Sequence, residues 1–261
     1  VLHRYCSIPE SVAMFEETQD RIDQGPKNVM VAIGATGDFL DRASALHDVG
    51  CRAFCIDVAH GHHAHVKRAL AALRSKYGDG IHIMSGNVAT LEAFNDLAEW
   101  GSDSIRVGIG GGSMCTTRVR TGHGIPTLQS VMDCAKSHHD VYVVADGGIR
   151  NSGDAVKVLA AGADMIMLGS ILAGHDESPG DMVDVNGSAT VITDSQGKRL
   201  SVPTIPGSCY KRFRGMASKE AQIDWRGHAS VVEGESTLVP YRGQIKSTID
   251  DLLDGIRSGL S

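Results

Sequence analysis

The sequence predicts an α/β protein built on a parallel sheet, and we expect a (β/α)8 TIM barrel whose first strand is absent from the sequence shown. Short, nearly continuous apolar runs recur along the chain, as is typical of parallel strands that are covered on both faces. Amphipathic stretches with helical periodicity lie between most of these runs, which indicates βαβ units. Polar, glycine-rich segments follow nearly every run, and a barrel carries its functional residues at those strand ends.

The individual elements follow from this pattern. The expected strands are residues 29–35, 53–59, 81–86, 104–109, 141–145 and 165–169, with residues 1–3 as the tail of a seventh strand. The expected helices are residues 38–50, 64–78 and 90–101, one that begins at Ser152, and a closing helix at 245–259. Helices often begin at a small polar residue, as at Asp38, Thr90 and Ser152. They often end at glycine, as at Gly50, Gly78 and Gly101.

An open, doubly wound sheet is the competing layout. A dinucleotide-binding fold needs G-x-G-x-x-G at the start of a helix and an acidic residue about 20 positions later. Gly108, Gly110 and Gly112 follow a strand, but no helix follows promptly at that spacing. We therefore expect one barrel domain over residues 1–261. Residues 175–240 break the repeat and predict a hairpin or flap insertion after the last strand, with a turn near Asp194–Gly197.

Composition excludes several classes of protein. The 261 residues are 42% hydrophobic, enough for a packed core, and the net charge of −6 argues against a dedicated nucleic-acid or anionic-membrane binder. No apolar run reaches the roughly 18 residues of a membrane span. The six cysteines contain no C-x-x-C pair and fit buried free thiols of a reducing compartment. We expect a cytoplasmic protein with no nucleic-acid or membrane partner.

Two segments carry the strongest signals for chemistry. GIGGGSMCTTR (108–118) places Cys115 on a flexible loop after a strand, where a thiol faces a pocket unless it packs beneath the loop. ADGGIRNSGD (145–154) and the later LGS (168–170) resemble phosphate-binding loops of barrels, although they could be simple turns. There Asp146 could bind a ribose diol. The run from His60 to His65 has metal-like spacing, but a solvated helix start is the better interpretation.

Together these motifs resemble the inosine-monophosphate dehydrogenase / GMP reductase family over nearly the whole chain. The motifs that carry the resemblance are IDVAHGH (56–62), SGNVAT (85–90), GIGGGSMCTTR (108–118), TGHGIPTLQSV (121–131), ADGGIRNSGD (145–154), GADMIMLGSILAGHDESPG (162–180), YKRFRGMAS (210–218) and VEGE (232–235). The resemblance implies a barrel fold with a mobile cysteine loop, a purine nucleotide substrate and a homotetramer. Gly111 departs from the proline usual in the reductase, and the insertion at 184–207 is longer than the family's hairpin.

Three features of the sequence favour the reductase over the dehydrogenase. Phe213 stands where the dehydrogenase usually has Tyr, and GHDESPG resembles the reductase segment. The segment between Met216 and Glu233 is short and holds no Arg-Tyr pair, which the dehydrogenase uses to activate water. The resemblance therefore implies NADPH-dependent conversion of GMP to IMP and ammonia through a covalent Cys115 thioimidate. The alternative is IMP dehydrogenase, which converts IMP and NAD to XMP, with Arg214 or Arg226 replacing the water base. A non-catalytic nucleotide-binding protein or a defective fragment, unable to fold alone, is the third hypothesis.

The resemblance also assigns roles to individual residues. The implied catalytic residues are Cys115, Thr117 and Glu233. The implied substrate-binding residues are Ser113, Asp146, Gly147, Gly148, Gly169, Ser170, Arg214, Gly215, Met216, Ala217 and Ser218. The implied cofactor-binding residues are Asp57, Asn87, Gly108 and Arg4, with Arg4 able to pair with Asp57. A monovalent cation such as K⁺ would be held by the carbonyls of Gly108, Gly110 and Cys115.

Overall fold

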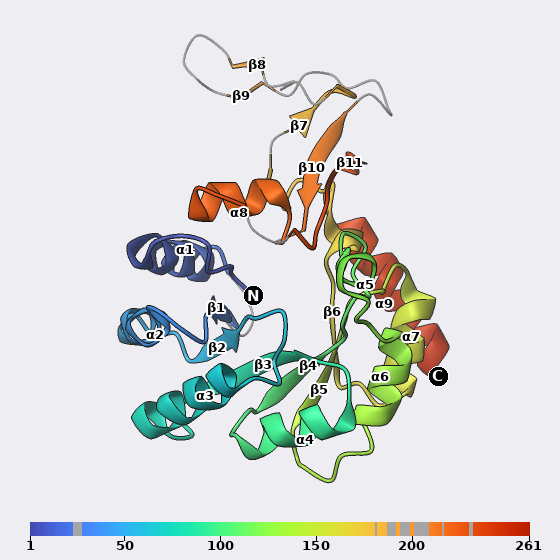
Figure 1. Ribbon diagram of the computed structural model, residues 1–261. Helices are drawn as coiled ribbons and strands as arrows, with labels where there is room; N and C mark the ends of the chain where they lie inside the picture. Colours follow the sequence, from blue (N-terminus) through green and yellow to red (C-terminus); the bar gives the residue numbers. More distant parts are fainter. Residues whose placement is uncertain are drawn as a thin grey trace. The chain divides into compact units, whose positions relative to one another are not determined.

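The computed structural model describes residues 1–22, 28–180, 182–186, 192–193, 199–200, 209–215, 217–229 and 232–261. The chain divides into two compact units (Figure 1). Unit 1 comprises Val1–Ile109, Ile125–Asp146 and Ala161–Ile166, and unit 2 comprises Gly110–Gly124, Gly147–Ala160 and Met167–Ser261. No helix among the described residues is long and apolar enough to cross a membrane.

A six-stranded sheet runs in sequence order from β1 to β6. Its strands are β1 (Val31–Ile33), β2 (Ala53–Ile56), β3 (His82–Val88), β4 (Ser104–Val107), β5 (Tyr142–Asp146) and β6 (Met165–Met167). The first five strands pair in parallel, so the predicted α/β fold with a parallel sheet is confirmed. Leu2 forms a parallel bridge with Val31, which agrees with the strand tail expected at residues 1–3.

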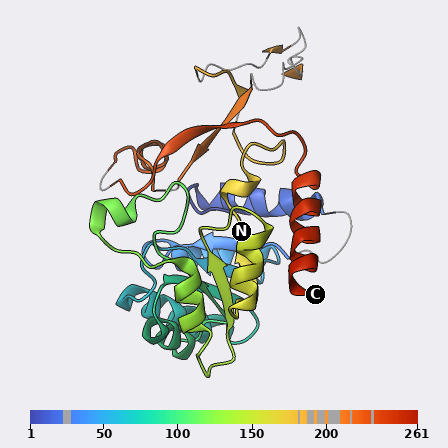
Figure 2. The same cartoon turned by 90° about the vertical axis from the view of Figure 1, so that its right-hand side faces the viewer.

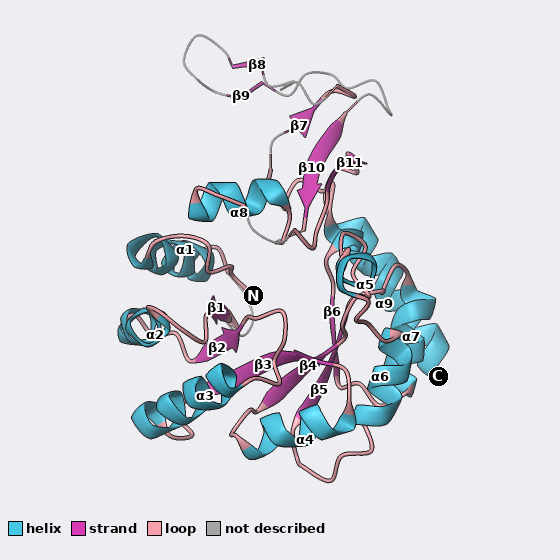
Figure 3. Cartoon of the chain, in the orientation of Figure 1, coloured by secondary structure: helices cyan, strands magenta, loops and turns pink. Residues whose placement is uncertain are grey.

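The helices of unit 1 alternate with these strands. They are α1 (Ile8–Asp20), α2 (Phe39–Asp48), α3 (Ala64–Tyr77), α4 (Leu91–Glu99) and α6 (Thr127–Cys134). Residues of α1, α2 and α3 and of the first three strands form a buried core that includes Phe54, Ile56, Leu70 and Ile83. Figure 3 shows α2, α3 and α4 on one side of the strands that they connect. The alternation of buried strand and amphipathic helix is therefore the pattern that the sequence predicts.

The predicted helix ends are largely correct. The Thr90 side chain accepts a hydrogen bond from the Ala93 N–H and caps α4. Asp38 occupies the N-cap position of α2 but caps no N–H, because its carboxylate binds Arg42 instead. Gly78 has φ +56 at the end of α3, a left-handed conformation that glycine adopts without steric cost.

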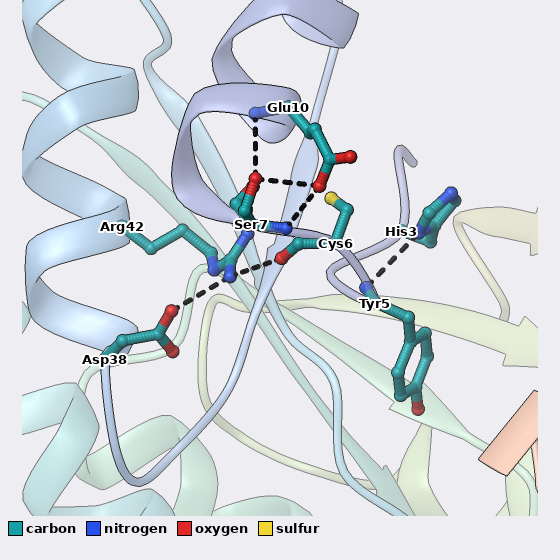
Figure 4. A network of polar contacts seen from close by, with 7 residues as sticks. All are labelled: His3, Tyr5, Cys6, Ser7, Glu10, Asp38 and Arg42. Carbon is teal, nitrogen blue, oxygen red and sulfur yellow. Dashed lines mark hydrogen bonds and ion pairs between the residues drawn. The ribbon is translucent and has the colours of Figure 1, made fainter. Parts of the chain in front are cut away.

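Helix α1 is not among the elements predicted from the sequence. It begins at a capping box formed by Ser7 and Glu10 (Figure 4). The Ser7 hydroxyl accepts the Glu10 N–H, and the Glu10 carboxylate accepts the Ser7 N–H at 2.8 Å. Arg42 of α2 donates to the Cys6 carbonyl at 2.8 Å and to Asp38 at 2.9 Å. Because the segment before α1 is bound to α2 in this way, the first helix is fixed to the rest of unit 1.

Unit 2 contains the helices and short strands outside the parallel sheet. Its elements are α5 (Thr117–Thr121), α7 (Ser152–Ala160), η1 (Ser170–Leu172), β7 (Met182–Val183), β8 (Ile192–Thr193), β9 (Arg199–Leu200), β10 (Tyr210–Arg214), α8 (Lys219–Arg226), β11 (Ser236–Pro240) and α9 (Lys246–Leu260). β10 pairs antiparallel with both β7 and β11, and β8 pairs antiparallel with β9. The predicted hairpin is thus present, while its turn at 194–198 lies outside the described residues. Helix α9 lies where the sequence predicts a helix at 245–259.

Candidate functional site

The loop that carries Cys115 begins where β4 ends, and its first glycine is required by the fold. A Cβ on Gly108 would lie 1.9 Å from the main-chain oxygen of Asp146, the last residue of β5, and the φ of Gly108 is +147. No other residue can bring these two strand ends so close together. The Asn87 side chain at the end of β3 donates to the Gly108 carbonyl at 2.8 Å. The ends of three neighbouring strands therefore meet in unit 1.

Cys115 belongs to a chain of three side chains in unit 2. The Cys115 thiol donates to the Thr117 Oγ1 at 3.2 Å, and the Thr117 hydroxyl donates to the Glu233 Oε2 at 2.7 Å. All three residues are partly buried. A thiol, a hydroxyl and a carboxylate in this order can pass a proton between the thiol and the carboxylate through the hydroxyl. The structure thus brings together the three residues expected to be catalytic.

Main-chain contacts hold this group in place. The Thr116 N–H donates to the Glu233 carbonyl at 2.9 Å, and the Glu235 N–H donates to the Met114 carbonyl at 3.0 Å. Cys115 itself forms an antiparallel bridge with Gly234. Residues 114–116 of the thiol loop are therefore paired with residues 233–235, which places the Glu233 carboxylate beside Thr117.

Glycines allow three further segments to approach the thiol loop. A Cβ on Gly215 would lie 3.3 Å from the Met114 Cβ, and one on Gly234 would lie 3.1 Å from the Ser218 N. A Cβ on Gly147, which has φ +89, would lie 2.9 Å from the Gly112 N. Of the expected substrate-binding residues, the structure therefore brings Gly147, Gly215, Ala217 and Ser218 to the loop or to its partner segment. These contacts expose backbone N–H and C=O groups rather than side chains.

The environment of Cys115 differs from that of the core thiols. Cys115 is partly buried, whereas Cys51, Cys55 and Cys134 are buried. Burial raises the pKa of Cys55 to about 11 and that of Cys134 to about 12. Burial also raises the pKa of Cys51. These three thiols therefore stay protonated at neutral pH and are poor nucleophiles.

A second group of functional side chains lies at the strand ends of unit 1. The Asn87 Nδ2 donates to the Asp146 Oδ2 at 2.8 Å as well as to the Gly108 carbonyl. Arg106 of β4 donates to the Asp57 Oδ1 at 2.8 Å. Asp57, Asn87, Gly108 and Asp146, all expected from the sequence, are thus connected around the ends of β2 to β5. The second carboxylate oxygen of Asp57 and the Asn87 Oδ1 are hydrogen-bond acceptors by their chemistry.

Arg106 belongs to this group of contacts, although the sequence does not point to it. It is buried, at 7% exposure, and burial works against its charge. The nearby Cys55 and the carboxylates of Asp57 and Asp146 nevertheless hold the pKa of the guanidinium above its usual value. Arg106 lies within the apolar run SIRVGI, where the sequence signals a strand rather than a site. Arg4 also contacts Asp57, as expected, through its Nε and the main-chain carbonyl at 3.3 Å.

The remaining expected site residues have no contact with these two groups among the described hydrogen bonds. Gly169 and Ser170 form the start of η1, and Ser113 and Gly148 are exposed. The Arg214 guanidinium forms an ion pair with Asp224. Met216 lies outside the described residues. The roles assigned to all of these residues stay predictions.

The oxygen atoms at the strand ends fit a nicotinamide cofactor better than a monovalent cation. A nicotinamide carboxamide needs acceptors for its NH₂ group, and the oxygens of Asp57 and Asn87 fit that need. For a monovalent cation, the Gly108 carbonyl already accepts from Asn87 and has one further lone pair. No group of three or more His, Cys, Asp or Glu side chains in the described part of the chain could hold a metal ion.

The histidine run has specific partners in unit 1. The His62 Nε2 lies 2.6 Å from the Asp96 Oδ2, and the His62 ring stacks on Trp100 at 5.6 Å. The His63 side chain accepts the His65 N–H at the start of α3. These contacts account for His62 and His63 as residues that cap and pack a helix.

Parallel strands in sequence order, with a thiol loop after β4 and polar groups at the strand ends, define an α/β fold that is consistent with a (β/α)8-barrel domain. The sequence matches the family model described as "IMP dehydrogenase / GMP reductase domain" over residues 1–261. The chain therefore belongs to the IMP dehydrogenase / GMP reductase family, as the resemblance predicts.

Individual relatives carry the names of both activities. The chain is 39% identical to an inosine-5'-monophosphate dehydrogenase of Nitrosopumilus maritimus (strain SCM1), over 91% of the chain and 48% of that protein. It is 40% identical to the Bacillus subtilis (strain 168) enzyme of the same name, over 89% of the chain and 45% of that protein. A solved GMP reductase C318A of Trypanosoma brucei, in complex with guanosine 5'-monophosphate, matches with a TM-score of 0.75 and 33% identity, over 89% of the chain and 45% of that structure.

These comparisons support a purine-nucleotide oxidoreductase family of nicotinamide-dependent enzymes. The curated relatives favour the dehydrogenase, which the sequence analysis kept as its alternative, over the reductase. The chain spans about half the length of the curated relatives it matches.

Proposed function

We propose that the protein acts on C2 of a purine 5'-nucleotide through a covalent Cys115 intermediate, and that its reaction is the reduction of GMP to IMP. The observation that carries this proposal is the Cys115–Thr117–Glu233 hydrogen-bond chain. A sequence feature supports the choice of reaction: the short segment before Glu233, Ala217–Val232, contains no Arg-Tyr pair to activate water. A reductase releases ammonia from GMP and needs no activated water, whereas the dehydrogenase must hydrolyse its intermediate.

The chemistry follows from the three side chains. The Cys115 thiolate forms a bond to C2 of GMP, and the exocyclic C2–N bond breaks. Thr117 and Glu233 deliver the proton that allows the amine to leave as ammonia, which leaves a thioimidate on Cys115. When bound, NADPH supplies a hydride to C2. The C2–S bond then breaks, Cys115 leaves as thiolate, and IMP remains.

Other residues would bind rather than react. We assign the ribose diol to the Asp146 carboxylate, and the phosphate to Ser113 and to the N–H groups of Gly147, Gly148, Gly169 and Ser170. The backbone of residues 214–218 would meet the purine edge, because Gly215 and Ser218 lie against the thiol loop and its partner segment. Asp57 and Asn87, with Arg4 and Gly108 beside them, would accept hydrogen bonds from the nicotinamide carboxamide. The homotetramer, the K⁺ ion and the cytoplasmic location stay proposals from the family.

The second candidate is IMP dehydrogenase, and the names of the curated relatives favour it. It would need a water base in place of the Arg-Tyr pair. Arg214 is a weak candidate because its guanidinium pairs with Asp224, which leaves Arg226 to be tested.

A single pair of assays separates the two candidates. Incubation with GMP and NADPH should consume NADPH and release ammonia in equal amounts, whereas IMP and NAD should give little XMP. Cys115→Ser should abolish the reaction, and Cys134→Ser, which alters a core thiol, should retain it. XMP formation that equals or exceeds the GMP-dependent rate would overturn the reductase in favour of the dehydrogenase. No turnover in either assay would leave neither activity standing.

A further inference from the structure

A pocket of about 300 Å³, open to solvent, lies in unit 2, and none of the residues expected to bind the nucleotide lines it. Its polar lining comprises Asn151 and six further side chains: Arg150, Ser152, Arg242, Ser247, Thr248 and Asp251. The volume is roughly ten times the ~30 Å³ that a water molecule occupies, enough for a small organic ligand. The proposed reaction uses none of these six side chains.

Helices α7 and α9 pack side by side (Figure 2), and residues from the first turns of both helices line the pocket. A Cβ on Gly255 of α9 would lie 2.2 Å from the Ser152 Oγ of α7, and one on Gly259 would lie 2.6 Å from the Val156 Cγ2. Gly255 meets Ser152, and Gly259, four residues later, meets Val156, which is also four residues later. The two helices therefore run parallel. Their N-termini therefore point the same way, and the first turns of α9 bring Ser247, Thr248 and Asp251 to the pocket.

The charged groups of the pocket do not neutralise one another. Neither Arg242 nor Asp251 forms an ion pair or a side-chain hydrogen bond with any residue that the structure describes. Arg150 donates from its Nε to Asp154 at 3.0 Å, which leaves its two Nη groups for a further acceptor. A pocket that holds unpaired groups of both signs favours a ligand that has an anionic end and hydrogen-bond donors.

We propose that this pocket binds a small phosphate monoester that also carries hydroxyl groups. The phosphate would accept from Arg242 and the Arg150 Nη groups, since guanidinium groups bind phosphate oxygens through paired, charge-assisted hydrogen bonds. The hydroxyl groups would donate to the Asp251 carboxylate. Ser247 and Thr248 supply further donors at the start of α9, whose N-cap residue Ile245 offers no capping side chain.

Isothermal titration calorimetry tests this site with glycerol 3-phosphate and with inorganic phosphate. Arg242→Gln should weaken the binding of both compounds by at least about tenfold, because charge-assisted hydrogen bonds are lost. Asp251→Asn should weaken glycerol 3-phosphate several-fold without weakening inorganic phosphate. Arg257→Gln is the matched control, because Arg257 lies on the same helix, pairs with Asp254 and does not line the pocket.

Two further variants make the outcome decisive. Arg242→Lys retains the charge and should bind more tightly than Arg242→Gln, which guards against a general loss of folding. Ser170→Ala, at the proposed nucleotide phosphate site, should leave glycerol 3-phosphate binding unchanged. Wild-type affinity in Arg242→Gln, or loss of binding in Ser170→Ala instead, would overturn the proposal. The readout is binding without turnover, so failure here is distinguishable from failure of the proposed reaction.

Discussion

Cys115 differs from the core thiols in its surroundings rather than in its chemistry. It sits on a loop bounded by glycines and donates to Thr117, whereas Cys55 and Cys134 are fully buried. A thiol reacts as its thiolate, and burial without a compensating cation disfavours that charged form. Position along the fold therefore decides which cysteines can react.

This difference predicts the order of alkylation. At pH 8, a limiting electrophile should label Cys115 first, because burial raises the pKa of Cys55 to about 11 and that of Cys134 to about 12. Labelling of these two should rise only as the pH approaches those values or the protein unfolds. Peptide mass mapping after brief alkylation provides the measurement, and bound GMP should block it at Cys115. Preferential labelling of Cys55 or Cys134 would contradict the covalent mechanism.

Arg106 shows why the second group of site residues is hard to foresee. Its guanidinium reaches Asp57, 49 positions away in the sequence, and that contact exists only when β2, β3 and β4 lie side by side. Cys115, Thr117 and their glycines are contiguous in the sequence, so their motif can be found from the sequence alone. The partnership with Glu233 came from the family resemblance, since no local pattern joins residues 116 positions apart.

At the scale of elements, the sequence predicts what repeats and misses what does not. All six strands of the parallel sheet were expected, because strands buried on both faces are continuous apolar runs. β10 was not expected, because Lys211, Arg212 and Arg214 make it look like a polar loop. Lys211 is nevertheless buried, at 5% exposure, because its ammonium donates to the carbonyls of His175 and Ser178. Such compensation depends on tertiary contacts and has no signature in the sequence.

The capping box of α1 is different, because its signal is local. Ser7, Pro9 and Glu10 match the pattern that begins a helix, and it could have been found in the sequence. The side-chain hydrogen bond from Ser7, followed by the main-chain N–H of Ser7, holds the pKa of the Glu10 carboxyl below its ordinary value. A lowered carboxyl pKa contributes stability above the unfolded-state pKa, and that contribution is lost as the pH falls through the folded-state pKa.

The capping box therefore predicts a pH-dependent loss of stability. Ser7→Ala should lower the free energy of unfolding by about 1 kcal/mol at pH 7, the usual cost of losing an N-cap side chain. The difference from wild type should shrink below about pH 4, where carboxyls near their ordinary pKa become protonated. Urea unfolding at pH 7 and at pH 3 measures both effects. Glu16→Gln, an exposed change on the same helix, should have little effect, and an unchanged Ser7→Ala variant would refute the role of the cap.

At the scale of the whole molecule, the two units follow from where the sheet ends. The chain enters unit 2 directly after β4, directly after β5 and at the end of β6. Unit 2 is thus assembled from segments that follow the carboxyl ends of neighbouring strands, where barrels place their functional loops. The thiol loop, the Gly147–Gly148 turn and Gly169–Ser170 all belong to such segments. These segments are rich in glycine, so the sequence distinguishes them from the strands and helices of the parallel sheet.

Nucleotide binding should also change the stability of the whole chain. A ligand that binds only the folded state at 100 times its Kd stabilises that state by about 2.7 kcal/mol, which corresponds to a rise in thermal midpoint of about 5–10 °C for a chain of this size. GMP should produce this rise in the wild type and also in Cys115→Ser, because ribose and phosphate contacts do not involve the thiol. Asp146→Asn should reduce the rise, since one carboxylate acceptor for the ribose is lost while the oxygen that accepts from Asn87 can remain.

Asp140→Asn, an exposed change just before β5, is the control in scanning calorimetry. An equal rise in Asp146→Asn and the wild type would remove Asp146 from the nucleotide site, and no rise in Cys115→Ser would show that nucleotide binding depends on the thiol itself.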